Sequence, residues 1–225
     1  MRAFIVKILK GIHLYEFAKK CYIKGEMYLK KIKGKIKGLA FKIRGGSVAY
    51  WEKRYEEGGN SGGGSYNRLA AFKAEVINEF LSEHTDIENC IEWGCGDGNQ
   101  LSLIQYKKYT GIDVSQTIVE KNKIKFKEDT SKSFFELSCF LNKESEEFDL
   151  SLSLDVIFHL IEDEVYEKYM ENLFRYSKKY VCIYSNNEEK VYQGNHVRDR
   201  KFTDWIDANK KDWKMVKFVK QRYPM

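Results

Sequence analysis

Apolar and polar positions alternate along the chain in blocks that predict strands separated by helices. Five short apolar runs predict buried strands, at residues 89–92, 109–114, 133–137, 148–155 and 180–185. Longer stretches with apolar side chains at helical spacing predict helices, at residues 66–80, 116–127, 164–176 and 202–210. A further apolar run predicts a sixth strand at residues 213–219. This order is typical of an α/β fold with a mostly parallel twisted sheet and helices on both faces.

The first 45 residues follow another pattern, in which Lys and Ile recur with glycines at positions 25, 34 and 38. Eleven Lys and two Arg against two Glu give this segment a charge of +11, so the remainder of a chain with +6 carries −5. Helically spaced apolar residues predict a basic amphipathic helix, at Ile5, Leu9, Ile12, Leu14 and Phe17. The glycines argue against one long rigid helix. We divide the chain into a basic N-terminal extension, residues 1–45, and a main domain, residues 46–225.

The composition indicates the cellular compartment of the protein and which kinds of binding site it can contain. Five cysteines without a C-x-x-C pair are typical of a reducing compartment, and the scattered His and Cys residues predict no metal site. No apolar run approaches the roughly 20 residues of a membrane-spanning helix, and the start is too short and too charged for a secretory signal. We expect a cytoplasmic protein. Two interpretations of the basic extension fit its sequence equally well. It is either a solvated N-terminal segment, or an element that contacts the inner membrane surface, a protein complex or nucleic acid.

A glycine-rich turn follows the first predicted strand, in the sequence Glu92-Trp93-Gly94-Cys95-Gly96-Asp97-Gly98. Alternating glycines allow a turn too tight for side chains, and the start of a helix after it would bring backbone N–H groups to a ligand. Asp113 ends the next strand 19 residues after Gly94. A carboxylate there can accept hydrogen bonds from both hydroxyls of a ribose. The two features together predict a nucleotide-containing ligand at one edge of the sheet.

The spacing of this turn distinguishes two families. A dinucleotide fingerprint would need its third glycine at Asn99. Instead, the glycines alternate after Glu92, and this motif with Asp113 resembles the class I S-adenosylmethionine-dependent methyltransferases. The resemblance implies a Rossmann-like fold, S-adenosylmethionine as cofactor and methyl transfer as the activity (EC 2.1.1.-). It implies cofactor contacts from residues on several strands and on the segment before the turn, namely Trp51, Tyr55, Glu92, Gly94, Cys95, Gly96, Gly98, Asp113, Val114, Ser138, Leu154 and Asp155.

The chain departs from that family in two places. An acid often follows the third strand, where it contacts adenine, but here Ser138-Cys139-Phe140 occupies this position. The family's sheet ends in a seventh, antiparallel strand, for which no residues follow the sixth predicted strand.

Aromatic residues and a Gly/Ser run precede the first helix of the main domain. Within the resemblance, the segment from Tyr50 through residues 58–65 is similar to the N-terminal lid that covers the cofactor; a plain linker is the alternative. As a lid, it would place Trp51 and Tyr55 against the cofactor. Arg54 and Ser65, the latter at the expected N-cap of the next helix, would hold a carboxylate or phosphate.

Candidate catalytic residues follow the fourth and fifth strands. Asp155 and His159 are four residues apart, hence on one face of a helical turn, and His196 lies on a later loop. Each is a candidate base that removes a proton from the methyl acceptor. The alternatives are a histidine packed over the cofactor and an aspartate that caps a helix. Arg198 and Arg200 beside His196 predict a clamp for an anionic substrate, with a solvated loop as the alternative.

Three functions remain open. Residues 50–80, 153–163 and 196–205 resemble methyltransferases of bacterial capsule and surface-polysaccharide clusters, which implies O-methylation of a small anionic acceptor such as a sugar-linked or phosphoramidate precursor. An RNA methyltransferase (ribose or ring) would use the basic extension on phosphates. Against nucleic acid, the sequence after the fourth strand is Asp155-Val156-Ile157-Phe158 rather than [DN]-P-P-[YF], and the main domain is acidic. A non-enzymatic docking module is the third alternative, although the intact glycine motif argues against it.

Overall fold

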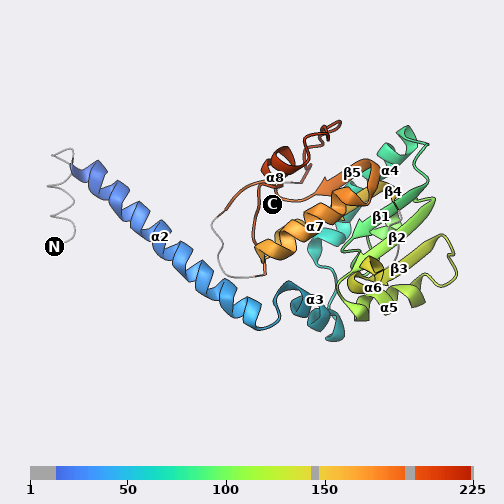
Figure 1. The fold of residues 1–225 in the computed structure, drawn as a ribbon, viewed down its shortest axis with the longest axis horizontal. Helices are drawn as coiled ribbons and strands as arrows, with labels where there is room; N and C mark the ends of the chain where they lie inside the picture. Colours follow the sequence, from blue (N-terminus) through green and yellow to red (C-terminus); the bar gives the residue numbers. More distant parts are fainter. Residues whose placement is uncertain (1–13, 143–146, 191–195, 224–225) are drawn as a thin grey trace.

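The chain is described from a computed structural model, which covers residues 14–142, 147–190 and 196–223. Its centre is a sheet in the order β3-β2-β1-β4-β5, and every pair of neighbouring strands is parallel. The strands are β1 (Asn89–Trp93), β2 (Lys108–Asp113), β3 (Lys132–Glu136), β4 (Phe148–Leu154) and β5 (Ser177–Tyr184). The strand order reverses between β1 and β4, and ligands of open α/β sheets bind beside such a reversal, at the carboxyl ends of the strands. The predicted Rossmann-like fold is confirmed (Figure 1).

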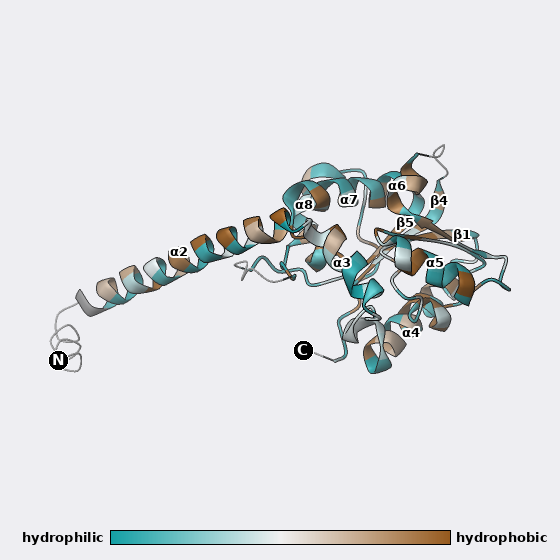
Figure 2. Cartoon of the chain, turned by 90° about the horizontal axis from the view of Figure 1, so that it is seen from below, coloured by the Kyte–Doolittle hydropathy of each residue, from teal (hydrophilic) through white to brown (hydrophobic). Residues whose placement is uncertain are grey.

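Helices cover both faces of the sheet because successive strand residues point to opposite sides. Cys90 of β1 belongs to the core under α4 (Asn67–Glu83) and α5 (Gln116–Lys125). Ile91 and Trp93 belong to the opposite core, under α7 (Asp163–Arg175), α6 (Leu137–Leu141) and α8 (Phe202–Asn209). Figure 2 shows α7 and α8 on one side of the sheet and α4 on the other. The short 3-10 helices are η1 (Gly63–Ser65), η2 (Leu101–Leu103) and η3 (Ile157–His159).

The predicted sixth strand is wrong. Residues 213–219 form no strand, and in the described part of the chain β5 ends the sheet. The segment lies beside α4 instead, where Lys217 pairs with Glu79 and Glu83, while Phe218 stays exposed. An apolar run indicates an extended segment, but a strand also needs a neighbour to accept its backbone hydrogen bonds.

The basic extension forms one long helix, α2 (Leu14–Ile43), which projects from the domain (Figure 1). The expectation that glycines would interrupt it is therefore wrong for the described residues. Each glycine costs about 1 kcal/mol relative to Ala, and that cost is spread over a helix rich in Lys, Leu and Ile. The predicted apolar positions Ile5, Leu9 and Ile12 lie outside the described residues. No described helix is long and apolar enough to cross a membrane.

A glycine pair joins α2 to α3 (Gly46–Glu56). Gly45 and Gly46 both have positive φ, which lets the chain change direction between the two helices. Glu162 fixes the start of α3, because its carboxylate accepts hydrogen bonds from the Ser47 backbone N–H (3.0 Å) and hydroxyl (2.6 Å). Glu162 is also the N-cap residue of α7, so this contact holds α3 against the domain.

Candidate functional site

The glycine turn after β1 is held by β2. The backbone N–H groups of Gly94 and Cys95 both donate to the Ile112 carbonyl, at 2.7 and 3.0 Å. Gly94 has φ +80°, and a Cβ there would collide with the Val156 side chain. The turn therefore needs glycine for its backbone angle and for its close approach to the loop after β4. The helix expected after the turn is shorter than predicted, since only η2 forms there.

Asp113 lies at the end of β2, directly beside this turn. Its carboxylate accepts hydrogen bonds from the backbone N–H groups of Gly96 and Ser115, both at 3.0 Å. Burial raises its pKa to about 6, although those N–H groups oppose the shift. Asp113 lines the cavity, and each carboxylate oxygen has a further lone pair besides the one that accepts from the backbone. This is the arrangement that can accept hydrogen bonds from ribose hydroxyls.

Glu92 is buried beneath the same cavity. The Tyr109 hydroxyl donates to its carboxylate at 2.7 Å. Burial raises the Glu92 pKa to about 7, opposed by this hydrogen bond and by the charge of Lys73. Two carboxyl groups whose pKa values are raised by burial, both lining one cavity, mark the site as a place that favours a cationic ligand.

The Gly/Ser loop closes over the glycine turn. Asp97 accepts hydrogen bonds from the Ser61 N–H and the Tyr66 hydroxyl, both at 2.8 Å, and its own N–H donates to the Ser61 hydroxyl. The plain-linker alternative does not fit these contacts. Ser65 is not the N-cap of α4, which is Tyr66 without a side-chain capping bond. Instead its carbonyl accepts from Asn99 Nδ2 at 2.6 Å.

Helix α3 forms the wall of the cavity opposite the sheet. Trp51 and Tyr55 line it, and Glu52 ties the helix to the start of α5 by accepting from the Thr117 hydroxyl at 2.7 Å. Arg54 lies over the Trp51 ring and donates to the Asn60 carbonyl at 2.7 Å. Helix α3 and the loop after it thus form a lid fixed on both sides.

Asp155 has a partner that the sequence pattern does not indicate. Lys73 of α4 forms an ion pair with its carboxylate, and the Lys73 side chain is only 1% exposed. The ammonium group also lies over the Tyr184 ring, 5.0 Å from its centroid. Burial raises the Asp155 pKa, and Lys73 opposes that shift. Asp155 lines the cavity, but its carboxylate is committed to an ammonium partner, so it is a poor candidate for the base.

Asp155 also has an unusual backbone conformation, with φ +61°. Non-glycine residues rarely adopt this region, and such strain clusters at functional sites. The expectation that Asp155 and His159 share a helical face is wrong, because only η3 forms here and Asp155 precedes it in a left-handed conformation. The apolar spacing of α4 hid Lys73, since a lysine between Phe72 and Ala74 usually faces solvent.

His159 lines the cavity from η3, and a backbone carbonyl sets its tautomer. Its Nδ1 lies 3.0 Å from the His196 carbonyl oxygen. Because a carbonyl only accepts, Nδ1 carries the proton and Nε2 keeps its lone pair. Burial lowers the His159 pKa to about 4, with a further contribution from Arg54. The ring stays neutral at ordinary pH and offers Nε2 as a hydrogen-bond acceptor.

A row of aromatic rings continues from His159 towards the extension. The His196 ring stacks between His159 and Tyr50, with centroid distances of 5.5 and 4.9 Å, and Trp51 meets the His159 ring edge-on at 4.9 Å. His196 does not line the cavity, so its ring supports His159 rather than reaching a ligand. The structure brings His159 and His196 together through this row of rings and one backbone carbonyl.

The predicted arginine clamp is not formed. Arg200 is buried, donates to the Leu160 and Ile161 carbonyls and pairs with Asp163 at 2.8 Å. Arg198 donates to the Ile161 carbonyl and also pairs with Asp163, at 2.9 Å. Both guanidinium groups hold the late loop against the start of α7, and neither lines the cavity. An arginine needs a free fork to bind an anion, and backbone carbonyls occupy these two.

The polar groups of Ser138 also bind another residue instead of reaching the cavity. It lies in α6, where its N–H and hydroxyl donate to Glu136, the N-cap of that helix. Leu137 takes its place in the cavity wall. Of the predicted site residues, those that do not line the cavity are Arg54, Gly98, Ser138, His196, Arg198 and Arg200. Those that line it are Trp51, Tyr55, Ser65, Glu92, Gly94, Cys95, Gly96, Asp113, Val114, Leu154, Asp155 and His159.

Residues 90–179 match the model of the family described as "Methyltransferase domain". Over these residues the chain is similar to a methyltransferase domain. The match covers the glycine turn, Asp113, Asp155 and His159. The comparison with curated proteins returned no match.

Several solved structures resemble part of the chain. A S-adenosylmethionine-dependent methyltransferase from Clostridium acetobutylicum is 20% identical over 47% of this chain and 45% of its own, with a TM-score of 0.40. Magnesium protoporphyrin IX methyltransferase from Synechocystis, with bound SAH, is 17% identical over 65% and 77%, with a TM-score of 0.48. CalS10, an amino pentose methyltransferase from Micromonospora echinaspora, is 11% identical over 48% and 47%, with a TM-score of 0.41. The chain spans about half the length of the Clostridium and Micromonospora proteins.

The cavity of the methyltransferase domain fits S-adenosylmethionine. Asp113 is positioned for ribose hydroxyls, the glycine turn provides close backbone approach, and buried carboxyl groups favour the cationic sulfonium and amino groups. The predicted class of enzyme agrees with the family match, and the cavity fits the predicted cofactor. Among the described residues, no three His, Cys, Asp or Glu side chains gather as a metal site would require.

Proposed function

We propose that this methyltransferase domain transfers a methyl group to a hydroxyl group of a small acceptor that lies in the cavity, against the wall formed by Trp51 and His159. The neutral His159 ring carries the proposal. Its Nδ1–H is held by the His196 carbonyl, and its Nε2 lone pair remains for the proton of the acceptor. S-adenosylmethionine supplies an activated methyl group when bound. The protein's task is to orient the acceptor and take up its proton.

The lid limits the size of the acceptor. Helix α3 and the Gly/Ser loop cover the cavity through Asp97, Thr117 and Tyr66. A polynucleotide would need this cover to open widely, and the acidic main domain would repel its phosphates. These features favour a small molecule over the RNA alternative.

The acceptor is proposed to be sugar-linked or phosphorylated, as in surface-polysaccharide biosynthesis, with a phosphoramidate precursor as one member of that class. The support is the sequence resemblance and the positive charge of Arg54. Arg54 lies close enough to His159 and His196 to lower the pKa of both. We assign the anion-binding role to Arg54 instead of Arg198 and Arg200, whose guanidinium groups are held by backbone carbonyls and Asp163. A neutral acceptor would instead use only the aromatic walls.

The extension is proposed to dock the domain to another surface and to take no part in catalysis. Helix α2 projects away from the domain (Figure 1), and no residue of α2 lines the cavity.

Calorimetric titration with S-adenosylhomocysteine tests the site. The native chain should bind at micromolar concentration, and Asp113→Ala should weaken binding about 100-fold, because two hydrogen bonds to a charged group contribute about 3 kcal/mol. Asp129→Ala is the matched control, since Asp129 is an acid outside the cavity. Failure of the folded native chain to bind would overturn the proposal.

Methyl-transfer assays then identify the acceptor class. Sugar phosphates, nucleotide sugars and matched neutral sugars should be compared on the native chain and on Arg54→Gln. Phosphorylated acceptors should react preferentially, and Arg54→Gln should reduce that preference. Equal rates on charged and neutral acceptors would refute the anionic class while leaving the methyltransferase itself intact.

A further inference from the structure

Helix α2 carries a continuous apolar stripe that no part of the described chain covers. At 3.6 residues per turn, positions 21, 25, 28, 32, 36, 39 and 43 fall on one strip of the helix roughly 80° wide. Apart from Gly25, they are Cys21, Tyr28, Ile32, Ile36, Leu39 and Ile43. Tyr28, Ile36, Leu39 and Ile43 are 61–78% exposed. Such a surface on a free helix marks an interaction site.

The domain attaches on the other side of the helix. Phe41, which points opposite to the stripe, packs against Tyr50 of α3 with ring centroids 6.2 Å apart. Lys42 pairs with Glu164 at 3.4 Å. At this end of α2 the stripe therefore faces away from Phe41 and the domain, and the rest of the helix projects from the domain (Figure 1). Folding of the described chain leaves it open to a partner.

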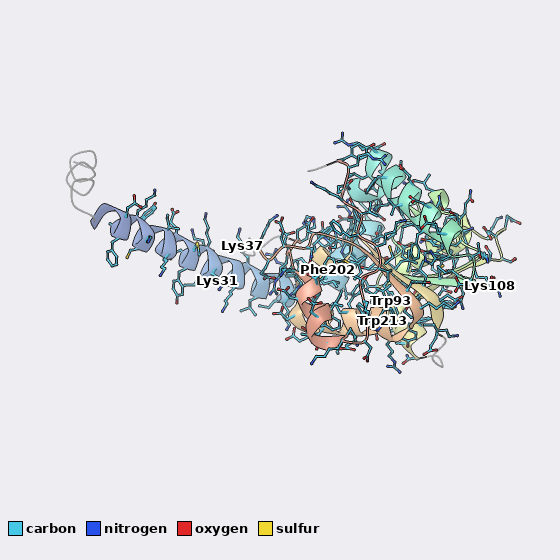
Figure 3. All side chains as sticks on the ribbon, turned by 90° about the horizontal axis from the view of Figure 1, so that it is seen from above. Lys31, Lys37, Trp93, Lys108, Phe202 and Trp213 are labelled. Carbon is cyan, nitrogen blue, oxygen red and sulfur yellow. The ribbon has the colours of Figure 1, made fainter. Side chains whose placement is uncertain are left out.

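Charge identifies the kind of partner. Helix α2 has nine lysines and two glutamates, and every lysine lies outside the stripe. Figure 3 places Lys31 and Lys37 along the part of α2 that stands free of the domain. The partner must therefore present apolar groups at its centre and negative charge on both sides.

We propose that α2 lies flat on an anionic lipid bilayer, with the stripe in the boundary between headgroups and acyl chains and the lysines that flank the stripe on lipid phosphates. This deepens the docking role proposed for the extension. A bilayer interface offers both kinds of contact over the roughly 45 Å length of a 30-residue helix. A second copy would bring two lysine-rich flanks together, and a nucleic acid has no apolar groove for the stripe.

Vesicle co-sedimentation of the full chain tests this surface. Vesicles of phosphatidylcholine with phosphatidylglycerol should bind it, with affinity that falls as salt rises, and pure phosphatidylcholine should bind at least tenfold less. The stripe variant Ile32→Glu/Ile36→Glu should lose at least tenfold in affinity. Its matched control is Ile23→Glu/Met27→Glu, which has the same spacing and charge change on the opposite face. The control should lose less than about threefold.

The outcomes separate this proposal from its rivals. Equal loss in both double variants, equal binding to the two kinds of vesicle, or no binding by the native chain would overturn it. So would a native dimer that only the stripe variant dissociates, since the stripe would then be a self-association surface. Circular dichroism checks that α2 stays helical in each variant. The native chain and all α2 variants should bind S-adenosylhomocysteine equally. If none of them binds it, the proposed catalytic function is overturned, but the proposal for α2 is not.

Discussion

Charged side chains are exposed on helix α2 but buried at the carboxyl edge of the sheet. In α2 the lysines are exposed beside exposed apolar residues, whereas at the sheet edge Glu92, Asp113 and Lys73 are almost completely buried. Removal of charges from water is costly unless they are paired, and the sheet edge pairs Lys73 with Asp155 and holds Asp113 on backbone N–H groups. The comparison teaches that charge alone does not locate function. We assign the most basic segment a proposed docking role, whereas the cavity depends on a few buried charges.

Loss of the buried ammonium should have the largest effect. Lys73→Met leaves the Asp155 carboxylate without its partner, and we expect the free energy of unfolding to fall by about 3–5 kcal/mol. Urea denaturation measures this. Addition of Asp155→Asn should restore part of the stability, because no unpaired charge is then left and asparagine tolerates the left-handed backbone of this position.

The matched control is Lys179→Met, which removes an exposed lysine paired with Asp86 and Asp149. It should cost no more than about 1 kcal/mol. Similar losses in both variants would mean that burial does not distinguish the two lysines.

A change at His159 should act on catalysis more than on binding. His159→Asn keeps a donor for the His196 carbonyl but removes the Nε2 acceptor. With an acceptor identified by assay, we expect kcat to fall about 100-fold and KM to change little. Because the His159 pKa lies at about 4, the native kcat should show no inflection near pH 6.5 from this residue. His196→Asn keeps the backbone carbonyl and should cost less than about tenfold; a larger loss would give the His196 ring a direct role.

Cofactor affinity should depend on pH through Asp113. Ribose hydroxyls donate to the ionised carboxylate, so binding lowers the Asp113 pKa from about 6 and releases a proton. Affinity for S-adenosylhomocysteine should therefore be constant well above pH 6 and fall as pH drops, by roughly tenfold per pH unit below it. Calorimetry between pH 5 and 8 measures this. Asp113→Asn should bind weakly with a flatter profile, and an unchanged slope would assign the proton to Glu92 instead.

Single charges on α2 should have the smallest effect. Lys31→Gln removes one solvated charge, and we expect stability to change by no more than about 0.5 kcal/mol and cofactor binding not at all. Denaturation and calorimetry on the same preparation provide both values. A measurable loss of cofactor affinity would mean that the extension and the cavity are coupled.

The sequence by itself determined the parts of this protein that depend on local spacing. The alternating glycines, Glu92 before them and Asp113 at the next strand end predicted a cofactor turn, and the apolar periodicity predicted all five strands. These features can be predicted because they depend only on residues close in sequence and on the alternation of side chains along a strand. The placement of Trp51 and Tyr55 in the cavity wall came from the resemblance of their segment to the family's N-terminal lid.

Only the tertiary structure decided which polar groups were left for a ligand. Arg198 and Arg200 looked like an anion clamp until the carbonyls after η3 were brought against them. Lys73 looked like a surface residue until β4 placed Asp155 beside it, and the His159 tautomer depends on a carbonyl 37 residues away. Residues 213–219 had the pattern of a strand without a strand to pair with. Each of these results depends on contacts between segments that are distant in sequence. The spacing of residues along the chain does not predict such contacts.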